Sequence, residues 1–217
     1  MGLDRNNRRF LEFAKNQWGV DFSETATLGH QEFHEPVIDV GMKYADDYLH
    51  FVLGAQRVAS FDASDYEGAT YIHDFNKPIN LEQYGRFTAV IDAGSLEHIF
   101  NFPQAISNCM DMVAEGGHLL IMTPANNLCG HGFYQFSPEL FYRVLSQWNG
   151  FKIQDMFSAE LPEANWNTIP DPEVVGYRVG VQSSKPTVLL VLAKKLVSVP
   201  LSLNHLQQSD YAVAWRT

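Results

Sequence analysis

The sequence predicts an α/β fold in which helices pack against a largely parallel β-sheet. Two observations carry this prediction. Short apolar runs with the length of buried strands alternate with segments whose apolar residues recur at helical spacing. This alternation favours parallel strands joined by right-handed helical crossovers. The 217 residues, 46% of them apolar, suffice for a full core, so we expect a single domain over residues 1–217.

The N-terminal third begins with a predicted helix. Residues 3–18 have an apolar stripe at helical spacing, so we expect a helical cap over residues 1–22. Residues 25–29 form an apolar run typical of a buried strand. Pro36 suits the first turn of a helix, where its missing N–H costs nothing. Apolar residues at helical spacing over 37–52 predict that this helix continues.

The remaining elements follow in the same alternation. Pro103 opens a predicted helix that Gly116-Gly117 would stop, and Pro124 would end the strand that follows. Ser137 and Pro138 are an N-cap and first-turn pair for a helix that reaches Trp148. Residues 158–185 are polar and are expected to form a variable insert between the last two strands. The predicted strands cover residues 58–62, 69–74, 87–92, 118–123, 151–157 and 186–192.

Four polar or flexible residues fall at the ends of predicted strands. They are Gly29, Asp62, Asp74 and Asp92. Parallel sheets bind ligands beyond the carboxyl ends of their strands, so we expect these residues to share one edge of the sheet and to suit a polar cofactor.

Residues 90–124 carry the most specific pattern in the chain. The triplet Leu96-Glu97-His98, the pair Gly116-Gly117 and the pair Thr123-Pro124 follow the strand-like VIDA in that order. This segment resembles class I S-adenosylmethionine-dependent methyltransferases, and the similarity extends over residues 25–157. The ubiquinone-biosynthesis O-methyltransferases are the most similar type. The resemblance implies a Rossmann-like sheet of seven strands, with helices on both faces and the last strand antiparallel. It also implies S-adenosyl-L-methionine as the cofactor.

The resemblance assigns residues to the methyl donor. Asp62 would bind the ribose hydroxyls, and Asp74, followed by Phe75, would lie beside the adenine. Asp92, Ala93 and Gly94 would line the methionine part. An alternative for Asp62 and Asp74 is a turn in which the side chain bonds the backbone nearby.

The first loop departs from the family pattern. The family has several glycines after the first strand, which let the backbone approach the cofactor closely. Here Gly29 stands alone before His30. The His30 side chain would either bond the cofactor or fill its place. The spacing from Asp62 to Asp74 is also too short for the helix that usually intervenes.

Glu97, His98 and His131 are the candidate catalytic residues. A neutral imidazole suits a general base for a hydroxyl acceptor near neutral pH. In some relatives, including small-RNA 2′-O-methyltransferases, a Glu-His pair of this kind helps to hold a divalent metal. Those enzymes have a further acid at the position where this chain has Gly94, so no metal is expected here. The alternative for Glu97 and His98 is a structural role at the start of the next helix.

Composition excludes several classes of function. The net charge of -10 disfavours a nucleic-acid partner, because phosphate binding needs a positive surface. No apolar run reaches the roughly 18 residues of a membrane-spanning helix, and the N-terminus lacks a signal-peptide pattern. Composition therefore predicts a cytoplasmic protein. The resemblance implies a methyltransferase with a small-molecule acceptor, with oxygen as the acceptor atom. The alternative is a non-catalytic or repurposed relative that binds a nucleoside-type ligand.

Overall fold

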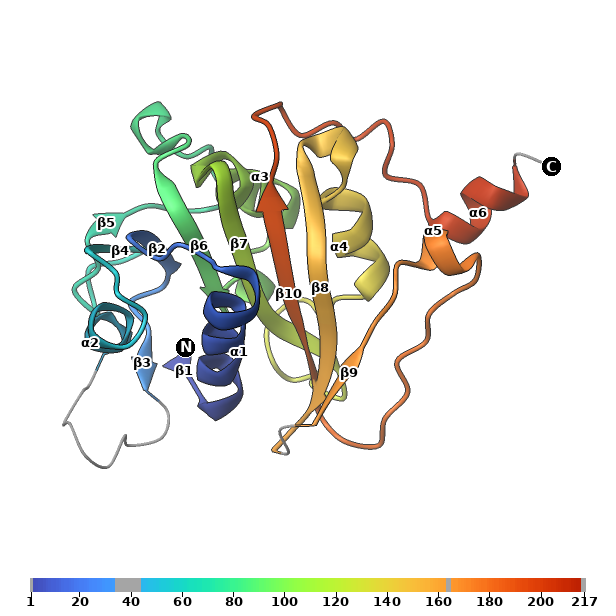
Figure 1. Cartoon of the computed structure of the whole chain (residues 1–217), viewed down its shortest axis with the longest axis horizontal. Coiled ribbons are helices and arrows are strands. Elements are labelled where there is room, and N and C mark those ends of the chain that lie inside the picture. The colour runs from blue at the N-terminus through green and yellow to red at the C-terminus, as the bar shows by residue number, and fades with distance from the viewer. Residues whose placement is uncertain (1, 34–43, 163–164, 216–217) are drawn as a thin grey trace.

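The computed structural model describes residues 2–33, 44–162 and 165–215. Its centre is one sheet of eight strands in the order β5–β4–β2–β6–β7–β10–β8–β9, shown in Figure 1. The strands are β2 (Glu24–Leu28), β4 (Arg57–Asp62), β5 (Tyr71–Ile72), β6 (Phe87–Ala93), β7 (Val113–Asn126), β8 (Phe151–Glu160), β9 (Trp166–Thr168) and β10 (Thr187–Lys195). A separate parallel pair joins β1 (Gly2–Leu3) to β3 (Glu32–Phe33).

The strand directions confirm the predicted architecture. The five strands from β5 to β7 are parallel to their neighbours, and β10, the last strand, is antiparallel to both β7 and β8. The seven predicted strands are all present. The eighth is the short β9, which pairs antiparallel with β8 and comes from the stretch expected to be a variable insert.

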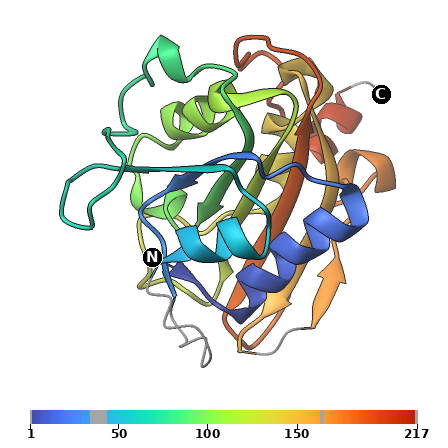
Figure 2. The same cartoon turned by 60° about the vertical axis from the view of Figure 1, so that its left-hand side comes forward.

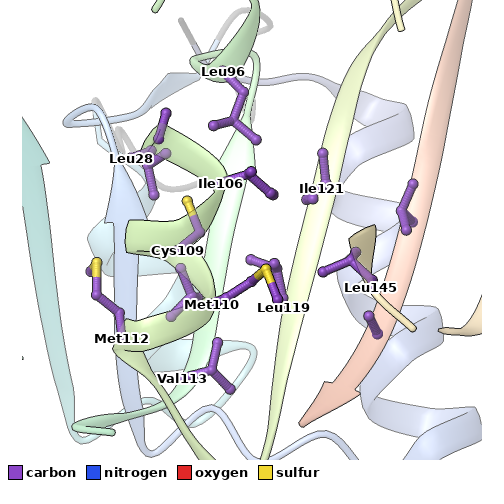
Figure 3. Close-up of a cluster of buried hydrophobic side chains, with 14 of the residues drawn as sticks. Leu28, Leu96, Ile106, Cys109, Met110, Met112, Val113, Leu119, Ile121 and Leu145 are labelled. Atoms are coloured by element: carbon purple, nitrogen blue, oxygen red, sulfur yellow. The ribbon is translucent and has the colours of Figure 1, made fainter. Parts of the chain in front are cut away.

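Helices cover both faces of the sheet, as Figures 1 and 2 show. Side chains of α1 and α2 pack in one core cluster, and those of α3 and α4 pack in the other. Figure 3 shows the second cluster, where Ile106, Cys109 and Met110 of α3 lie near Leu119 and Ile121. Leu120 and Met122 belong to the opposite cluster, as the alternation of side chains along a strand requires. The helices are α1 (Arg5–Trp18), α2 (Ala45–Phe51), α3 (Phe102–Met112), α4 (Pro138–Val144), α5 (Pro172–Val175) and α6 (Ser209–Ala214), with 3₁₀ turns η1 (Leu81–Gln83), η2 (Leu96–His98) and η3 (Gln147–Asn149).

Side-chain caps mark the starts of two helices. The first helix begins at Arg5 and not at residue 3, because Leu3 belongs to β1, whereas α4 begins at Pro138 as predicted. Asp4 Oδ1 accepts a hydrogen bond from Asn7 N at 2.8 Å at the start of α1. Ser137 caps α4 by accepting from Leu140 N, and Pro138 occupies the first turn. Each cap satisfies a backbone N–H that has no partner within its helix. Of the helix predicted from Pro36 and over residues 37–52, the described residues show only α2, which begins at Ala45 after the extended Tyr44; Pro36 lies outside the described residues.

Several predicted boundaries were wrong, for local reasons. Gly116 and Gly117 do not stop a helix; α3 ends at Met112 and the glycines lie within β7, where its pairing with β6 shifts register. A Cβ on Gly117 would come within 2.8 Å of Thr88 O, so this close approach of strands requires glycine. Pro124 does not end β7, because the register shifts beside Val188, its partner on β10.

Two further elements are shorter than predicted. The helix expected to reach Trp148 ends at Val144, and the strand expected over 69–74 pairs only at Tyr71–Ile72. Residues 63–70 form turns and bends, as the short spacing between Asp62 and Asp74 predicts. None of the described helices combines the length and hydropathy that crossing a bilayer requires.

Candidate active site

Glu97, His98 and His131 meet at the carboxyl edge of the sheet. Glu97 and His98 lie in the 3₁₀ turn η2 directly after β6, and His131 lies in the loop after β7. Glu97 Oε1 is 3.3 Å from His131 Nε2 and 4.0 Å from His98 Nε2. The two imidazole rings approach with centroids 4.9 Å apart. The structure therefore brings together the three residues that the sequence proposed as catalytic.

Backbone contacts hold the His131 loop against Glu97. The carbonyl oxygen of Glu97 accepts hydrogen bonds from Phe133 N at 2.8 Å and from Tyr134 N at 3.3 Å. Between His131 and Phe133, Gly132 has φ +77°, and a Cβ there would come within 2.8 Å of that same oxygen. The position requires glycine both for its left-handed backbone and for this close approach. His131 is thus positioned by a tight loop, not by chance proximity.

Glu97 is the buried member of the group. Its side chain is 1% exposed, whereas His98 and His131 are 41% and 52% exposed. Glu97 Oε2 accepts a hydrogen bond from Thr123 Oγ1 at 3.2 Å. Burial raises the pKa of Glu97, while the neighbouring imidazoles and Thr123 oppose this rise. A carboxylate held in this way can orient His131 and stabilise its protonated form.

Asp92 is enclosed by the protein beside this group. The residue is fully buried, and its Oδ1 accepts hydrogen bonds from Ser95 N at 2.9 Å and Leu96 N at 3.2 Å. Its Oδ2 has no hydrogen-bond partner among the described residues. Burial, and secondarily the charge of Glu97, raise the pKa of Asp92 well above its usual range. In the structure Asp92 shapes the turn that presents Glu97.

A cavity of about 350 Å³ opens over the three candidate residues. Ala93, Gly94 and Thr123 form part of its wall beside them. Gly94 has φ +90°, and a Cβ at this position would come within 3.3 Å of Glu97 Oε1. The bare backbone of Gly94 therefore leaves room in front of the carboxylate.

The N-terminal segment completes the cavity. Gly2, Asp4 and Asn7 line it together with residues from four later parts of the chain, which are Met122, Pro124, Leu128, Leu161 and Val188. Sequence reasoning missed these lining residues. The sequence could have predicted Thr123 as a lining residue, because it ends an apolar strand just before the loop that carries His131. No pattern in the sequence predicts that Gly2, Asp4, Leu161 or Val188 would line the cavity.

The loop after β2 has the side chain of His30 where the family has a further glycine. Gly29, at φ +76°, uses its N–H to bond Phe61 O at 2.7 Å. The His30 ring stacks on Tyr44, with centroids 4.0 Å apart. Its Nδ1 lies 2.5 Å from Glu67 O and its Nε2 lies 3.3 Å from Asp46 Oδ2. Through these contacts His30 joins neighbouring segments of the chain.

Three further residues were predicted to bind the methyl donor, namely Asp62, Asp74 and Phe75. Asp62 ends β4 and is half-buried, and its Oδ1 accepts from Ser64 N at 3.2 Å, which is the local turn considered as its alternative. Asp74 forms the local turn considered as its alternative, with Oδ1 accepting from Asn76 N at 3.0 Å and from Asn76 Nδ2 at 2.8 Å. These bonds lower the pKa of Asp74. Phe75 is buried in the core edge-to-face with Phe61. Asp62, Asp74 and Phe75 are all absent from the lining of the cavity.

Other polar side chains of the loop after β7 hold it in place. Gln135 Oε1 accepts from Leu128 N at 2.8 Å, and Tyr134 Oη donates to Phe100 O at 2.6 Å. Asn126 Nδ2 donates to Ser183 O at 3.4 Å. These contacts give the three residues a structural role, and none of the three lines the cavity, whereas His131 does.

Comparison with known proteins identifies the fold. No protein-family description matches the sequence, and no curated protein matches it either. Solved structures do match. The Burkholderia thailandensis 1,6-didemethyltoxoflavin-N1-methyltransferase, solved with S-adenosylhomocysteine, is 13% identical with a TM-score of 0.51, over 89% of this chain and 79% of that one. The [4+2]-cyclase SpnF is 12% identical with a TM-score of 0.57, over 88% and 82%.

A third similar structure is larger. The branched-chain polyamine synthase from Thermus thermophilus, solved with N4-aminopropylspermidine and 5′-methylthioadenosine, is 13% identical with a TM-score of 0.50. The match covers 91% of this chain but spans only 58% of the synthase. At these identities the likeness shows a Rossmann-like methyltransferase fold. Because the same fold serves a methyltransferase, a cyclase and a polyamine synthase, the function must be argued from the site.

Proposed function

We propose that this protein is an S-adenosylmethionine-dependent methyltransferase that transfers a methyl group to an oxygen of a small molecule. The observation that carries the proposal is the cavity at the carboxyl edge of β6 and β7, with Glu97, His98 and His131 in its wall. Ligands of open α/β sheets bind at this edge. The fold supports the choice of donor, since S-adenosylhomocysteine is named in one similar structure.

Two of the residues predicted to bind S-adenosylmethionine, Gly94 and Asp62, have a chemistry that suits this ligand. Gly94 offers bare backbone at the cavity, where a side chain would crowd Glu97. Asp62 ends its strand with a carboxylate suited to ribose hydroxyls. S-adenosylmethionine supplies a methyl group on a positively charged sulfur. The C–S bond breaks as the new O–C bond forms, and the sulfur keeps the electron pair.

The protein's own contribution is alignment and removal of one proton. The acceptor hydroxyl would lose its proton to the free ring nitrogen of His131 or of His98, since both imidazoles line the cavity. In His131 this nitrogen would be Nδ1, because Nε2 is the atom that contacts Glu97 Oε1. Glu97 would orient His131 through the 3.3 Å contact and stabilise the imidazolium that forms. Alignment alone is worth several kcal/mol in such displacements, and a positioned base adds about 10²–10⁴-fold.

Calorimetric titration with S-adenosylmethionine and with S-adenosylhomocysteine tests the proposal. We expect micromolar binding of both ligands. Asp62→Ala should weaken binding more than tenfold, because hydrogen bonds to a carboxylate are lost, and Asp65→Ala, an exposed aspartate in the same turn, should not. Equal affinities for the two variants would reject the role of Asp62.

A repurposed fold is the second candidate. The observation that favours it is the filled first loop, where His30 stacks on Tyr44 and contacts Glu67 and Asp46. Failure of both ligands to bind at millimolar concentration would select this candidate.

A further inference from the structure

We propose that Glu97, His98 and His131 form a binding site for one divalent transition-metal cation. The site itself is argued from geometry, and its role in the reaction rests on the proposed function. The sequence argued against a metal, because Gly94 replaces an acid. The spatial arrangement of the three side chains argues for one.

The donor atoms lie within reach of a common cation. A ligand atom of each residue lies within 4.8 Å of the others, and the closest pair, Glu97 Oε1 and His131 Nε2, is 3.3 Å apart. Bond lengths of about 2.0–2.2 Å to zinc place neighbouring ligand atoms roughly 3–3.5 Å apart. Small rotations of the two partly exposed imidazoles would bring all three atoms to that spacing.

The donor set selects the class of cation. Two imidazoles with one carboxylate suit first-row transition metals such as zinc, cobalt or iron, and three ligands leave positions open. The same three residues line the 350 Å³ cavity, so those open positions would face it. An acceptor oxygen or water could occupy them.

Neighbouring hydrogen bonds and the Gly132 turn hold Glu97 and His131 in place without a bound cation. Thr123 Oγ1 donates to Glu97 Oε2, which leaves Oε1 directed at the imidazoles. Hydrogen bonds of this kind orient metal ligands and strengthen binding. The Gly132 turn and the two hydrogen bonds to Glu97 O fix the loop that carries His131. Asp4 adds a further carboxylate to the cavity wall.

A bound cation would change how the acceptor loses its proton. It would polarise an acceptor hydroxyl and lower the pKa of that hydroxyl, so that the proton leaves to solvent. His98 and His131 would then act as ligands. The inferred acceptor class is a small molecule whose hydroxyl can bind a metal.

Titration of the full chain with Co²⁺, without donor or acceptor, tests the site. We expect one Co²⁺ per chain, with visible absorption bands typical of a low-coordinate site, and competition by Zn²⁺. Glu97→Gln, His98→Ala and His131→Ala should each weaken binding at least tenfold. Thr123→Val should weaken it by up to about 10–100-fold. His205→Ala, an exposed histidine that stacks on Trp148, is the matched control and should bind as the wild type does.

Circular dichroism and melting temperature verify that each variant is folded. Failure of the folded wild type to bind Co²⁺ stoichiometrically, or binding that the three ligand variants leave unchanged, would overturn the inference. Titration with S-adenosylmethionine in the presence of a chelator separates the two proposals. Donor binding without Co²⁺ binding rejects the metal site alone, whereas Co²⁺ binding without donor binding rejects the methyltransferase alone.

Discussion

Gly132→Ala is the substitution that most directly tests how the candidate site is held together. Gly132 has φ +77°, a conformation that costs a residue with a Cβ about 1–2 kcal/mol. The added Cβ would also come within 2.8 Å of Glu97 O and 3.0 Å of Glu97 Cγ. Overpacking of this kind typically costs about 1–3 kcal/mol. Together we expect a loss of roughly 2–5 kcal/mol, unless the loop moves away and carries His131 with it.

The assay combines thermal unfolding with Co²⁺ and activity measurements. A loss of this size should lower the melting temperature by roughly 4–20 °C in a chain of this length. If the loop moves instead, the melting temperature falls less, but Co²⁺ affinity and turnover fall because His131 leaves Glu97. Gly130→Ala is the matched control, since Gly130 is exposed in the same loop and has no atoms within 4 Å of an added Cβ. Indistinguishable behaviour of the two variants in all three measurements would refute the argument that this loop is fixed against Glu97.

Two other predictions concern acid stability and turnover. Burial lowers the pKa of His118 to about 4 from 6.5. Below pH 6.5 the unfolded chain therefore binds a proton that the folded protein does not, and stability falls by about 2 kcal/mol between pH 7 and pH 5. His118→Asn should remove this part of the pH dependence in urea unfolding; an unchanged slope would contradict it. His131→Ala should reduce kcat at least about 100-fold with little change in donor affinity, measured by calorimetry, while a parallel loss of both would indicate a folding defect.

Local patterns were sufficient to predict the layers of this fold. The apolar stripe of residues 3–18 predicts α1, and the run HLLIMT predicts the centre of β7. These patterns hold because a helix or strand buries one face or both, and burial dictates which residues are apolar. Ser137 and Pro138 predicted the start of α4 for an equally local reason, since the cap involves residues three apart.

Predictions failed where a neighbour in space sets the structure. Gly116 and Gly117 are typical of a helix end, yet they lie in a strand because Thr88 O approaches Gly117 closely. Pro124 is typical of a strand end, yet β7 continues because the register shift beside Val188 tolerates it. In both cases the deciding contact lies on another strand, which no local window contains.

The sequence by itself determined the α/β class, the parallel core of the sheet and the edge at which a site would form. It also identified Glu97, His98 and His131 as residue types suited to chemistry. Only the tertiary structure decided which side chains reach the cavity. Asp92 is fully buried, accepts hydrogen bonds from the N–H groups of Ser95 and Leu96, and does not line the cavity, whereas Asp4 from the N-terminal segment does. The physical reason is that the direction of a side chain at a strand end depends on hydrogen bonds and close approaches, which exist only once distant segments have packed together.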